Sequence, residues 1–232
     1  MWENTLYVEP MPITYARRCS KCTGRHVESI DKTEVPPMYR HVDITKFKFD
    51  IYQVDGAALH KLAYNFMNYF EAWEENGKGL YLWSKTPGSG KTFLACCLGK
   101  SIMIRTQKIF RFITVPDYMA KVGDSYKREK GARDESAIYR ECDLLVLDDI
   151  GAQMHGEWQE QELYRLIDTR LNHGKVTVFT SNSSVETLKL EERTKNRVQK
   201  STISLHMPEE SIRTKKATEE QTEFLKRMGV IQ

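Results

Sequence analysis

The chain has 232 residues, a length that suits one ordinary domain with an appendage or two small domains. Apolar residues make up 40% of the sequence and charged residues 29%, with 35 Lys and Arg against 32 Asp and Glu, so the formal net charge is +3. This balance excludes a disordered polyelectrolyte and a nucleic-acid binder held by bulk charge alone, although a local basic patch is compatible with it.

The sequence shows no sign of a membrane or secretory protein. No apolar run approaches the roughly 18 residues that a membrane helix needs, and the first residues lack the basic start and apolar stretch of a signal peptide. The five cysteines are an odd number without the spacing of a disulfide framework, which indicates reduced thiols. We therefore expect a cytoplasmic protein with no membrane partner.

Residues 1–35 are polar and form a predicted N-terminal segment, which ends at an extended joint before Pro36. Within this segment Cys19 and Cys22 have the spacing of a zinc knuckle, and His26 is near enough to be a third ligand. A fourth ligand would have to come from elsewhere, for example from another subunit. The segment therefore either binds Zn²⁺ or carries a simple thiol pair.

From Leu59 onwards the chain alternates between helical and strand patterns. Apolar residues at three- and four-residue spacing from Leu59 to Trp73 predict a helix that ends at Asn76 and Gly77. The predicted strands are 79–84, 108–114, 143–147, 176–179 and 202–207. The predicted helices are 91–105, a polar stretch to residue 140, 157–172, 185–198 and, in the tail, 217–228. This alternation predicts an α/β fold in which a parallel β-sheet is sandwiched by helices.

A glycine-rich loop lies between the first predicted strand of this sheet and the helix after it. Such a loop directs backbone N–H groups at phosphates, and the helix N-terminus adds its dipole. Lys91 would reach the β- and γ-phosphates of ATP, and the Thr92 hydroxyl would contact Mg²⁺. The residues expected to bind the nucleotide are Pro87, Gly88, Ser89, Gly90, Lys91, Thr92 and Phe93.

Lys85 departs from the usual pattern of such loops, which places a glycine at this position. If the position requires a positive φ, a lysine costs about 1 kcal/mol there. The sequence therefore predicts a slightly reshaped loop with weakened nucleotide affinity.

Polar residues follow the predicted strands 143–147 and 176–179. Because the carboxyl ends of parallel strands meet at the ligand crevice, Asp148 is predicted to hold Mg²⁺ and Asp149 to orient or deprotonate an attacking water. Asn182 either positions that water or is an ordinary turn residue.

The glycine-rich loop, the acid pair Asp148 and Asp149, and the polar residue Asn182 resemble, in order and spacing, the corresponding elements of the AAA+ ATPases of the DnaC/DnaI helicase-loader and IstB family. The resemblance covers about residues 35–215 and includes the segments 35–40, 112–117 and 147–153. It implies an AAA+ P-loop ATPase domain at 36–215, followed by a C-terminal tail helix within 216–232. In that pattern Lys91 and Thr92 are the Walker A pair, Asp148 and Asp149 the Walker B acids, and Asn182 is sensor 1.

The resemblance also assigns roles to arginines, each of which would otherwise be read as a solvated surface cation. Arg193, in preference to Arg197, is expected to be an arginine finger supplied to the nucleotide of a neighbouring subunit. Arg213 is expected to be sensor 2. A finger supplied in trans implies self-association, and the planar donors of arginine suit contact with phosphate oxygens.

A basic stretch between the second and third predicted strands is the candidate nucleic-acid surface. In the loaders this region lines the path of single-stranded DNA, which here points to Lys121, Lys127, Arg128 and Lys130. Acidic residues are interleaved, so a solvated helix face is the alternative.

The resemblance implies a DNA-stimulated ATPase that assembles with copies of itself and loads a replicative DNA helicase onto single-stranded DNA in DNA replication. One alternative is a transposition helper ATPase of the IstB kind, with a transposase partner and duplex DNA. Another is a nucleotide-gated adaptor with little turnover, which the Lys85 and Asp149 variations favour.

Overall fold

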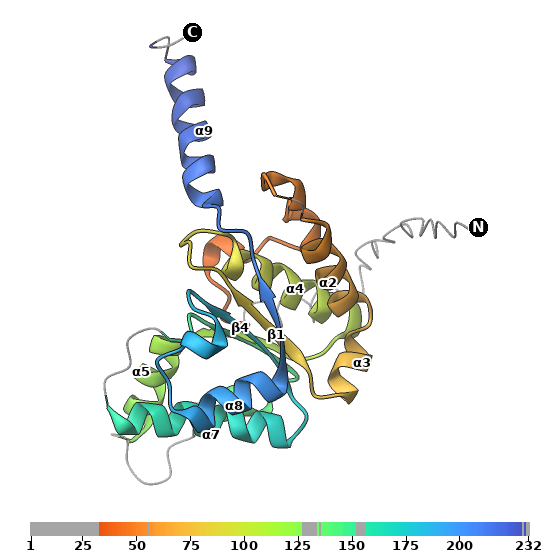
Figure 1. Ribbon diagram of the computed structural model, residues 1–232, viewed down its shortest axis with the longest axis vertical. Coiled ribbons are helices and arrows are strands. Elements are labelled where there is room, and N and C mark those ends of the chain that lie inside the picture. Colours follow the sequence, from red (N-terminus) through yellow and green to blue (C-terminus); the bar gives the residue numbers. More distant parts are fainter. Residues whose placement is uncertain are drawn as a thin grey trace, which may run out of the picture.

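A five-stranded parallel β-sheet with the strand order β2-β3-β4-β1-β5 forms the centre of the molecule (Figure 1). The computed structural model describes residues 33–228 and 230, apart from 55, 127–133, 135 and 152–155. The strands are β1 (Gly79–Trp83), β2 (Phe110–Thr114), β3 (Leu144–Asp148), β4 (Val176–Ser181) and β5 (Thr202–His206). Each lies where the sequence predicted a strand, and the predicted α/β class is confirmed.

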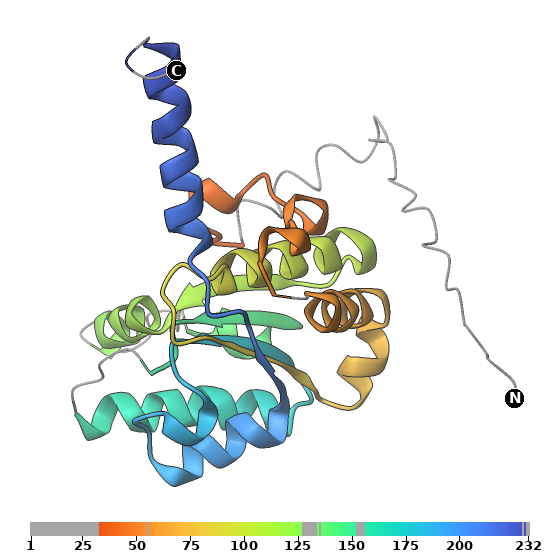
Figure 2. The same ribbon diagram turned by 45° about the horizontal axis from the view of Figure 1, so that its top comes forward.

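Helices cover both faces of the sheet, as parallel strands joined by crossover connections require. One face carries α2 (Ala57–Asn68), α3 (Phe70–Glu75) and α4 (Lys91–Thr106), and the other carries α5 (Val115–Tyr126), α6 (Ala137–Glu141), α7 (Glu157–Asn172) and α8 (Glu192–Ser201). Figure 2 shows α4 above the sheet and α7 with α8 below it. Successive strand side chains alternate between the two layers, since Leu80 and Leu82 pack with α4 and Tyr81 packs with α7.

Three short 3₁₀ turns precede α2 and pack against the α4 layer. They are η1 (Pro37–Tyr39), η2 (Ile44–Lys46) and η3 (Phe49–Ile51). The backbone N–H of Ile44 donates to the Ser101 hydroxyl on α4 at 3.1 Å. This segment therefore lies along α4, the helix that begins at the glycine-rich loop.

The strand register brings several carboxyl ends to one edge of the sheet. Leu82 on β1 lies opposite Thr180 on β4, and Leu147 on β3 lies opposite Phe179. Asp148, the residue after Leu147, is therefore level with Thr180 and close to the loop that follows β1. The fold thus assembles the predicted acid pair and the predicted phosphate loop at the same edge.

The helix predicted from Leu59 to Trp73 is two helices. Tyr69 leaves the helical conformation, with φ −118° and ψ 34°, and separates α2 from α3. Across this break the Phe66 ring packs edge-on against Trp73, with ring centroids 5.0 Å apart, and the Trp73 indole donates to Asn65. The apolar spacing continues through the break, which is why the sequence pattern did not reveal it.

The helix predicted over 185–198 is also divided. A 3₁₀ turn, η4 (Val185–Thr187), ends at Leu188, where ψ is 135°, and α8 begins only at Glu192. Leu188 and Leu190 are buried in the intervening segment. Packing of these leucines, rather than helical periodicity, therefore sets the path of the chain here.

The predicted tail helix begins earlier than expected, as α9 (Ile212–Arg227), with Ser211 as its N-cap. Both ribbon views show α9 standing out from the body that surrounds the sheet (Figures 1 and 2). The predicted limit between residues 215 and 216 falls inside α9. At the other limit, Val35 is buried and Thr33 accepts a backbone hydrogen bond from Phe112, so the domain limits remain predictions. No helix in the described ranges combines the length and the apolar character needed to cross a membrane.

Candidate nucleotide site

The phosphate loop joins β1 to α4 and contains two glycines with left-handed backbone angles. The φ angle is +79° at Gly88 and +95° at Gly90, a region that favours glycine. A Cβ at Gly88 would lie 2.9 Å from Ser211 Oγ, and one at Gly90 would lie 3.1 Å from Ile212 Cδ1. Gly90 caps α4 without a side chain, so the first N–H groups of this 16-residue helix face the loop. An uncapped helix N-terminus of this kind suits phosphate binding.

Lys91 is held inside the loop. Its side chain is buried, and Nζ donates to Ser84 O at 3.1 Å, Thr86 O at 3.2 Å and Ser89 Oγ at 3.2 Å. Burial lowers the pKa of Lys91, while the nearby Glu209 carboxylate acts to raise it. The ammonium group is therefore fixed by oxygens of the loop itself.

Pro87 and Phe93 flank this arrangement. Pro87 is exposed at the turn of the loop, whereas Phe93 is half-buried on the first turn of α4. The Phe93 ring packs against Tyr39 and Phe47, with centroid separations of 5.8 and 5.7 Å. Phe93 thus anchors the start of α4 to the segment that precedes α2.

Lys85 does not have the backbone conformation that would penalise a lysine. The non-glycine residues with positive φ in the described ranges are Glu34, Gln107 and Asp149. The condition for strain at Lys85 is therefore not met, and the reshaping argument based on it was wrong. Instead, the backbone N–H groups of Lys85 and Thr86 donate to the Glu209 carboxylate at 2.9 and 2.8 Å.

Asp148 lies beside the loop and is held by two threonines. Its Oδ1 accepts from Thr92 Oγ1 at 2.8 Å and from Thr180 Oγ1 at 2.6 Å. Burial raises the pKa of Asp148, and these two hydroxyl donors act in the opposite direction. The structure thus brings together Thr92 and Asp148, the two residues predicted for Mg²⁺, and their hydroxyl and carboxylate oxygens are the hard ligands that Mg²⁺ prefers.

Asp149 follows β3 in a left-handed conformation, with φ +60°, which aspartate tolerates better than most residues. Its backbone N–H donates to Thr180 Oγ1 at 2.9 Å, and the next N–H, of Ile150, donates to Thr180 O at 2.9 Å. These bonds hold the turn that places the Asp149 carboxylate after Asp148.

Asn182 is exposed just beyond the end of β4. Ser181 lies opposite Trp83 in the β1–β4 pair, so Asn182 is level with Ser84 at the start of the phosphate loop. The fold therefore places Asn182 at the same edge as the acid pair.

Arg213 reaches the site because α9 begins at the phosphate loop. The Gly88 carbonyl accepts hydrogen bonds from the backbone N–H groups of Ile212, at 3.0 Å, and Arg213, at 3.3 Å. Burial lowers the pKa of Lys91, and the nearby charge of Arg213 adds a smaller decrease. The predicted sensor 2 residue is thus close to the predicted phosphate-binding lysine.

Arg193 and Arg197 lie on α8, within the layer formed with α7. Arg193 Nε is 2.5 Å from Glu191 Oε2, and its guanidinium lies over the Tyr164 ring at 4.8 Å. Arg197 Nε is 2.6 Å from Asp168 Oδ1. Both candidate fingers therefore have partners in their own chain.

Of the four basic residues predicted to contact DNA, Lys121 is described, and Lys127, Arg128 and Lys130 lie outside the described residues. Lys121 forms an ion pair with Glu34 and donates to the Tyr139 hydroxyl at 2.8 Å. Its charge is thus already balanced within the chain, and the DNA surface stays a prediction.

The zinc candidates Cys19, Cys22 and His26 also lie outside the described residues. Over the part of the chain that is described, no three His, Cys, Asp or Glu side chains gather as a metal site. Zinc binding by the N-terminal segment stays a prediction.

Three residues that the sequence analysis did not select complete the site. Thr180 bonds to both acids of the pair, Tyr52 donates its hydroxyl to Ser89 O at 2.7 Å, and Glu209 accepts from the start of the loop. Thr180 could have been found from the strand register, since it is level with Asp148. Tyr52 and Glu209 approach the loop only through tertiary structure and left no local signal.

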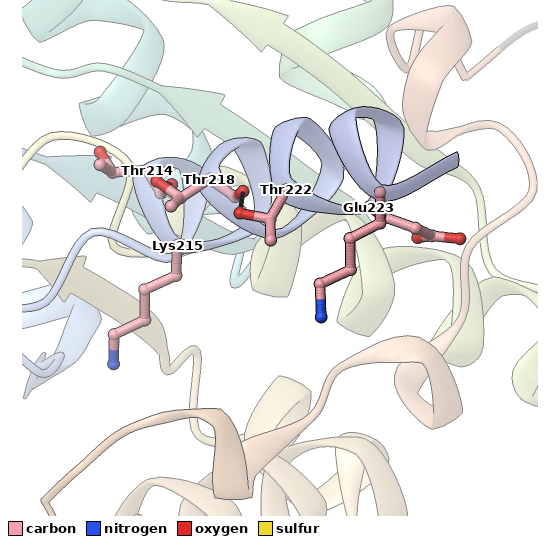
Figure 3. A pocket seen from close by; sticks show the side chains of 6 residues that line it. Thr214, Lys215, Thr218, Thr222 and Glu223 are labelled. Carbon is pink, nitrogen blue, oxygen red and sulfur yellow. Dashed lines mark hydrogen bonds between the residues drawn. The ribbon is translucent and has the colours of Figure 1, made fainter. Parts of the chain in front are cut away.

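A shallow hollow runs along one side of α9, lined by Thr214, Lys215, Thr218, Thr222, Glu223 and Lys226 (Figure 3). The Thr218 and Thr222 hydroxyls donate to the carbonyls four residues earlier, at 3.0 and 2.8 Å. These hydroxyls are thus engaged by their own helix.

Solved structures with the same fold include the DnaC helicase loader, at 21% identity and a TM-score of 0.61, covering 75% of this chain and 100% of that one. They also include DnaI, at 17% identity and a TM-score of 0.63, covering 76% and 96%. These likenesses show that the chain shares the fold of these solved proteins.

Among curated proteins, the replicative helicase loader DnaC of Escherichia coli (strain K12) is 27% identical over 140 residues, which are 60% of this chain and 56% of the relative. The chain thus spans little more than half the length of this relative. The family of IstB-like ATP binding proteins matches residues 25–199, three quarters of the sequence. The chain therefore belongs to the IstB-like ATP binding protein family.

Proposed function

We propose that the protein binds and hydrolyses ATP with Mg²⁺ and acts as a helicase loader, placing a replicative DNA helicase on single-stranded DNA. The observation that carries the nucleotide part of this proposal is the corner formed by Lys91, Thr92 and Asp148, and the helicase-loading part is supported by the likeness to DnaC. There a buried ammonium, a hydroxyl and a carboxylate meet the uncapped N-terminus of α4. Phosphate oxygens and a hard divalent cation fit this set of donors and acceptors.

The residues around this corner suit hydrolysis. Lys91 and the loop N–H groups bind the phosphates. Thr92 and Asp148 would hold Mg²⁺, which would supply positive charge against the negative charge that develops during phosphoryl transfer. Asp149 orients the attacking water and accepts its proton, and Asn182 helps to fix that water from the end of β4. Arg213, on the first turn of α9 beside Gly88, contacts the phosphates.

Self-association completes the site through Arg193. In a single chain Arg193 pairs with Glu191 and lies on Tyr164, on a partly exposed face. Such exposed ion pairs are weak, typically about 0–1 kcal/mol. Arg193 can therefore exchange Glu191 for the phosphate of a neighbouring subunit at little cost.

Binding of single-stranded DNA is assigned to the basic stretch from Lys121 to Lys130. A sequence-tolerant strand binder needs cations with occasional aromatic side chains, and this stretch supplies both. Lys121 would have to exchange Glu34 for a DNA phosphate. Because each phosphate contact releases counterions from the DNA, binding is expected to weaken as the salt concentration rises.

The decisive experiment measures phosphate release from ATP by the purified protein, with and without single-stranded DNA, beside the variants Lys91→Ala and Asp149→Asn. Turnover that rises with DNA and is lost in both variants supports a DNA-stimulated ATPase. Tight ATP binding without turnover under any DNA condition would instead support the nucleotide-gated adaptor. One of the two features that favoured the adaptor, backbone strain at Lys85, is absent from the structure.

A transposition helper is the second candidate, because the family that matches the chain is named for IstB-like proteins, whereas the curated relative described above is a helicase loader. Both functions use the same nucleotide site. Pull-down with a replicative helicase and with a transposase, each in the presence of ATP, separates the two.

A further inference from the structure

The carboxylate of Glu209 lies against the start of the phosphate loop. Glu209 belongs to the short connection between β5 and α9. It accepts hydrogen bonds from Lys85 N at 2.9 Å, Thr86 N at 2.8 Å, Thr86 Oγ1 at 2.7 Å and Ser84 Oγ at 3.0 Å. One side chain thus binds three consecutive residues of the loop.

The outer side of this carboxylate is fixed by His206. His206 Nε2 is 2.7 Å from Glu209 Oε1, and the His206 ring stacks on Trp83 with centroids 4.1 Å apart and planes 18° from parallel. Although desolvation acts to raise the pKa of Glu209, the hydrogen bonds from His206 and the loop hold it far below its ordinary value. Glu209 is therefore an anion at neutral pH.

The hydrogen bond from Lys85 N–H to Glu209 orients one of the two peptide groups that hold Lys91. The N–H groups of Lys85 and Thr86 face Glu209, while the Ser84 and Thr86 carbonyls accept from Lys91 Nζ. The Ser84 carbonyl and the Lys85 N–H belong to the same peptide group, so rotation of this peptide would turn the Ser84 acceptor away from the ammonium. The Thr86 carbonyl belongs to the peptide that joins Thr86 to Pro87, and Glu209 holds it through the N–H and the hydroxyl of the same residue. The Glu209 charge also favours the protonated form of Lys91.

The contact with Glu209 fixes the backbone conformation at a position where this loop departs from the usual sequence pattern. Lys85 stands where related loops have a glycine, and Glu209 is a tertiary partner that fixes the backbone at this position. The connection carrying Glu209 leads directly to Ile212 and Arg213, whose N–H groups bind Gly88 O. A single stretch of chain therefore holds the loop at its beginning and at its middle.

We propose that Glu209 is a positioning residue for nucleoside triphosphate binding, acting through residues 84–86 on Lys91. The proposal rests on the function proposed above, because it assumes that the loop binds a nucleotide. Charge-assisted hydrogen bonds are about twice as strong as neutral ones, yet the Glu209 side chain is 37% exposed, which moderates the effect.

The test compares Glu209→Ala with Glu210→Ala. Glu210 is the adjacent acid, and its carboxylate accepts from Gln53 N at 2.8 Å and pairs with Lys215 rather than with the loop. Both variants remove one negative charge from the same connection. Titration calorimetry with ATP and Mg²⁺ gives the Kd, steady-state phosphate release gives KM and kcat, and thermal unfolding without nucleotide reports folding.

Glu209→Ala raises the Kd and KM for ATP about tenfold and leaves kcat within about threefold, since the variant keeps the Lys91 charge and loses only the order of the loop before ATP binds. Glu209→Gln, which keeps one acceptor oxygen, raises the Kd about threefold. Glu210→Ala leaves the Kd within about twofold of the wild type. A purely structural role for Glu209 would instead lower the unfolding midpoint and leave the KM of the folded protein unchanged.

The outcomes separate this proposal from the function on which it rests. A wild-type protein that binds no nucleotide overturns the proposed function itself. A wild type that binds ATP, with a Glu209→Ala variant that matches Glu210→Ala, overturns the positioning role alone. Tighter ATP binding by Glu209→Ala also overturns it, because the carboxylate would then act mainly by repelling phosphate.

Discussion

The phosphate-loop corner and the α8 face hold their charged side chains in different ways. At the loop, Lys91 and Asp148 are each 8% exposed, and each contacts at least two polar groups of the surrounding backbone and side chains. On α8, the Arg193 and Arg197 side chains are 49% and 36% exposed, and each has one carboxylate partner beside Tyr164. The first set is preorganised, and the second can change partners without disturbing the core.

The difference indicates which part of the proposed site one chain supplies by itself and which part it supplies to a neighbouring chain. Preorganised donors in a buried corner lose little order when an anion binds, which suits binding and charge stabilisation. An arginine in a surface ion pair loses little stabilising free energy when it moves to a better acceptor. The corner is therefore expected to bind nucleotide in a monomer, whereas turnover is expected to require a second chain.

Lys91→Ala breaks the corner itself and should have the largest effect. Loss of the buried ammonium removes both a phosphate contact and the charge that stabilises the transition state, so turnover falls about 10³-fold. Lys91→Arg does not rescue it, because a planar guanidinium cannot replace a compact ammonium among Ser84 O, Thr86 O and Ser89 Oγ. Phosphate release checks both variants, and Lys91→Arg activity near the wild-type level would contradict the geometry described for Lys91.

Asp149→Asn separates chemistry from binding within the corner. The amide keeps the size of the side chain and removes the proton acceptor, so kcat falls about 10²-fold. The Kd for ATP stays within about threefold, because Asp148, Thr92 and Lys91 are untouched. Titration calorimetry with ATP, paired with single-turnover hydrolysis, measures the two quantities. An equal loss in Asp149→Asn and in a control, Asp124→Asn on α5, would indicate a general effect of surface charge.

Mixing two variants of low activity tests whether Arg193 on α8 acts on the nucleotide of a neighbouring chain. Arg193→Ala is expected to lower turnover about 30-fold and to leave the affinity for ATP unchanged. This loss is smaller than the 10³–10⁵-fold typical of arginine fingers, because the nearby Arg197 can replace part of the lost charge. Arg193→Ala mixed with Asp149→Asn should regain part of the activity, since one interface then pairs an intact corner with an intact Arg193. Activity of the mixture equal to the mean of its two components would contradict a finger supplied in trans.

The residues of the phosphate-loop corner were easier to predict from the sequence than the residues that hold the loop in place from other parts of the chain. The glycines, Lys91 and Asp148 carry a local pattern, because a phosphate loop needs residues of fixed type at fixed spacing. The β-strands were also predictable, since buried parallel strands are short apolar runs. Those signals depend only on neighbours along the chain.

Tyr52, Glu209 and the break at Tyr69 could not be predicted in this way. Tyr52 and Glu209 are 37 and 124 residues from the loop positions they bind, and no local periodicity encodes such contacts. Tyr69 interrupts a helix in which the apolar spacing is preserved, so the pattern is the same with or without the break. Strain at Lys85 was expected from the pattern of related loops, and it is missing because the backbone there is not left-handed.

Asp143 lies at the opposite edge of the sheet from the phosphate loop, so its substitution should have the smallest effect on activity. Its carboxylate pairs with Lys175 at 2.8 Å and accepts from Ile109 N at 2.9 Å, at the amino end of β3. Although desolvation acts to raise it, the hydrogen bonds from Lys175 and Ile109 lower the pKa of Asp143. A carboxyl whose pKa is depressed in the folded state stabilises the protein above its unfolded pKa of about 3.9 and loses that contribution as the pH falls through the folded pKa.

Asp143→Asn should therefore be less stable than the wild type at pH 7, and the difference should begin to shrink as the pH falls below about 4 and disappear once the pH is below the folded pKa of Asp143. Urea unfolding followed at a series of pH values measures this difference. ATP turnover at pH 7 should stay within about twofold of the wild type, since Asp143 lies at the end of β3 away from the corner. A stability difference that persists unchanged into acid would show that the Asp143 charge does not stabilise the fold. A large loss of turnover in a folded variant would show that the two ends of β3 are coupled.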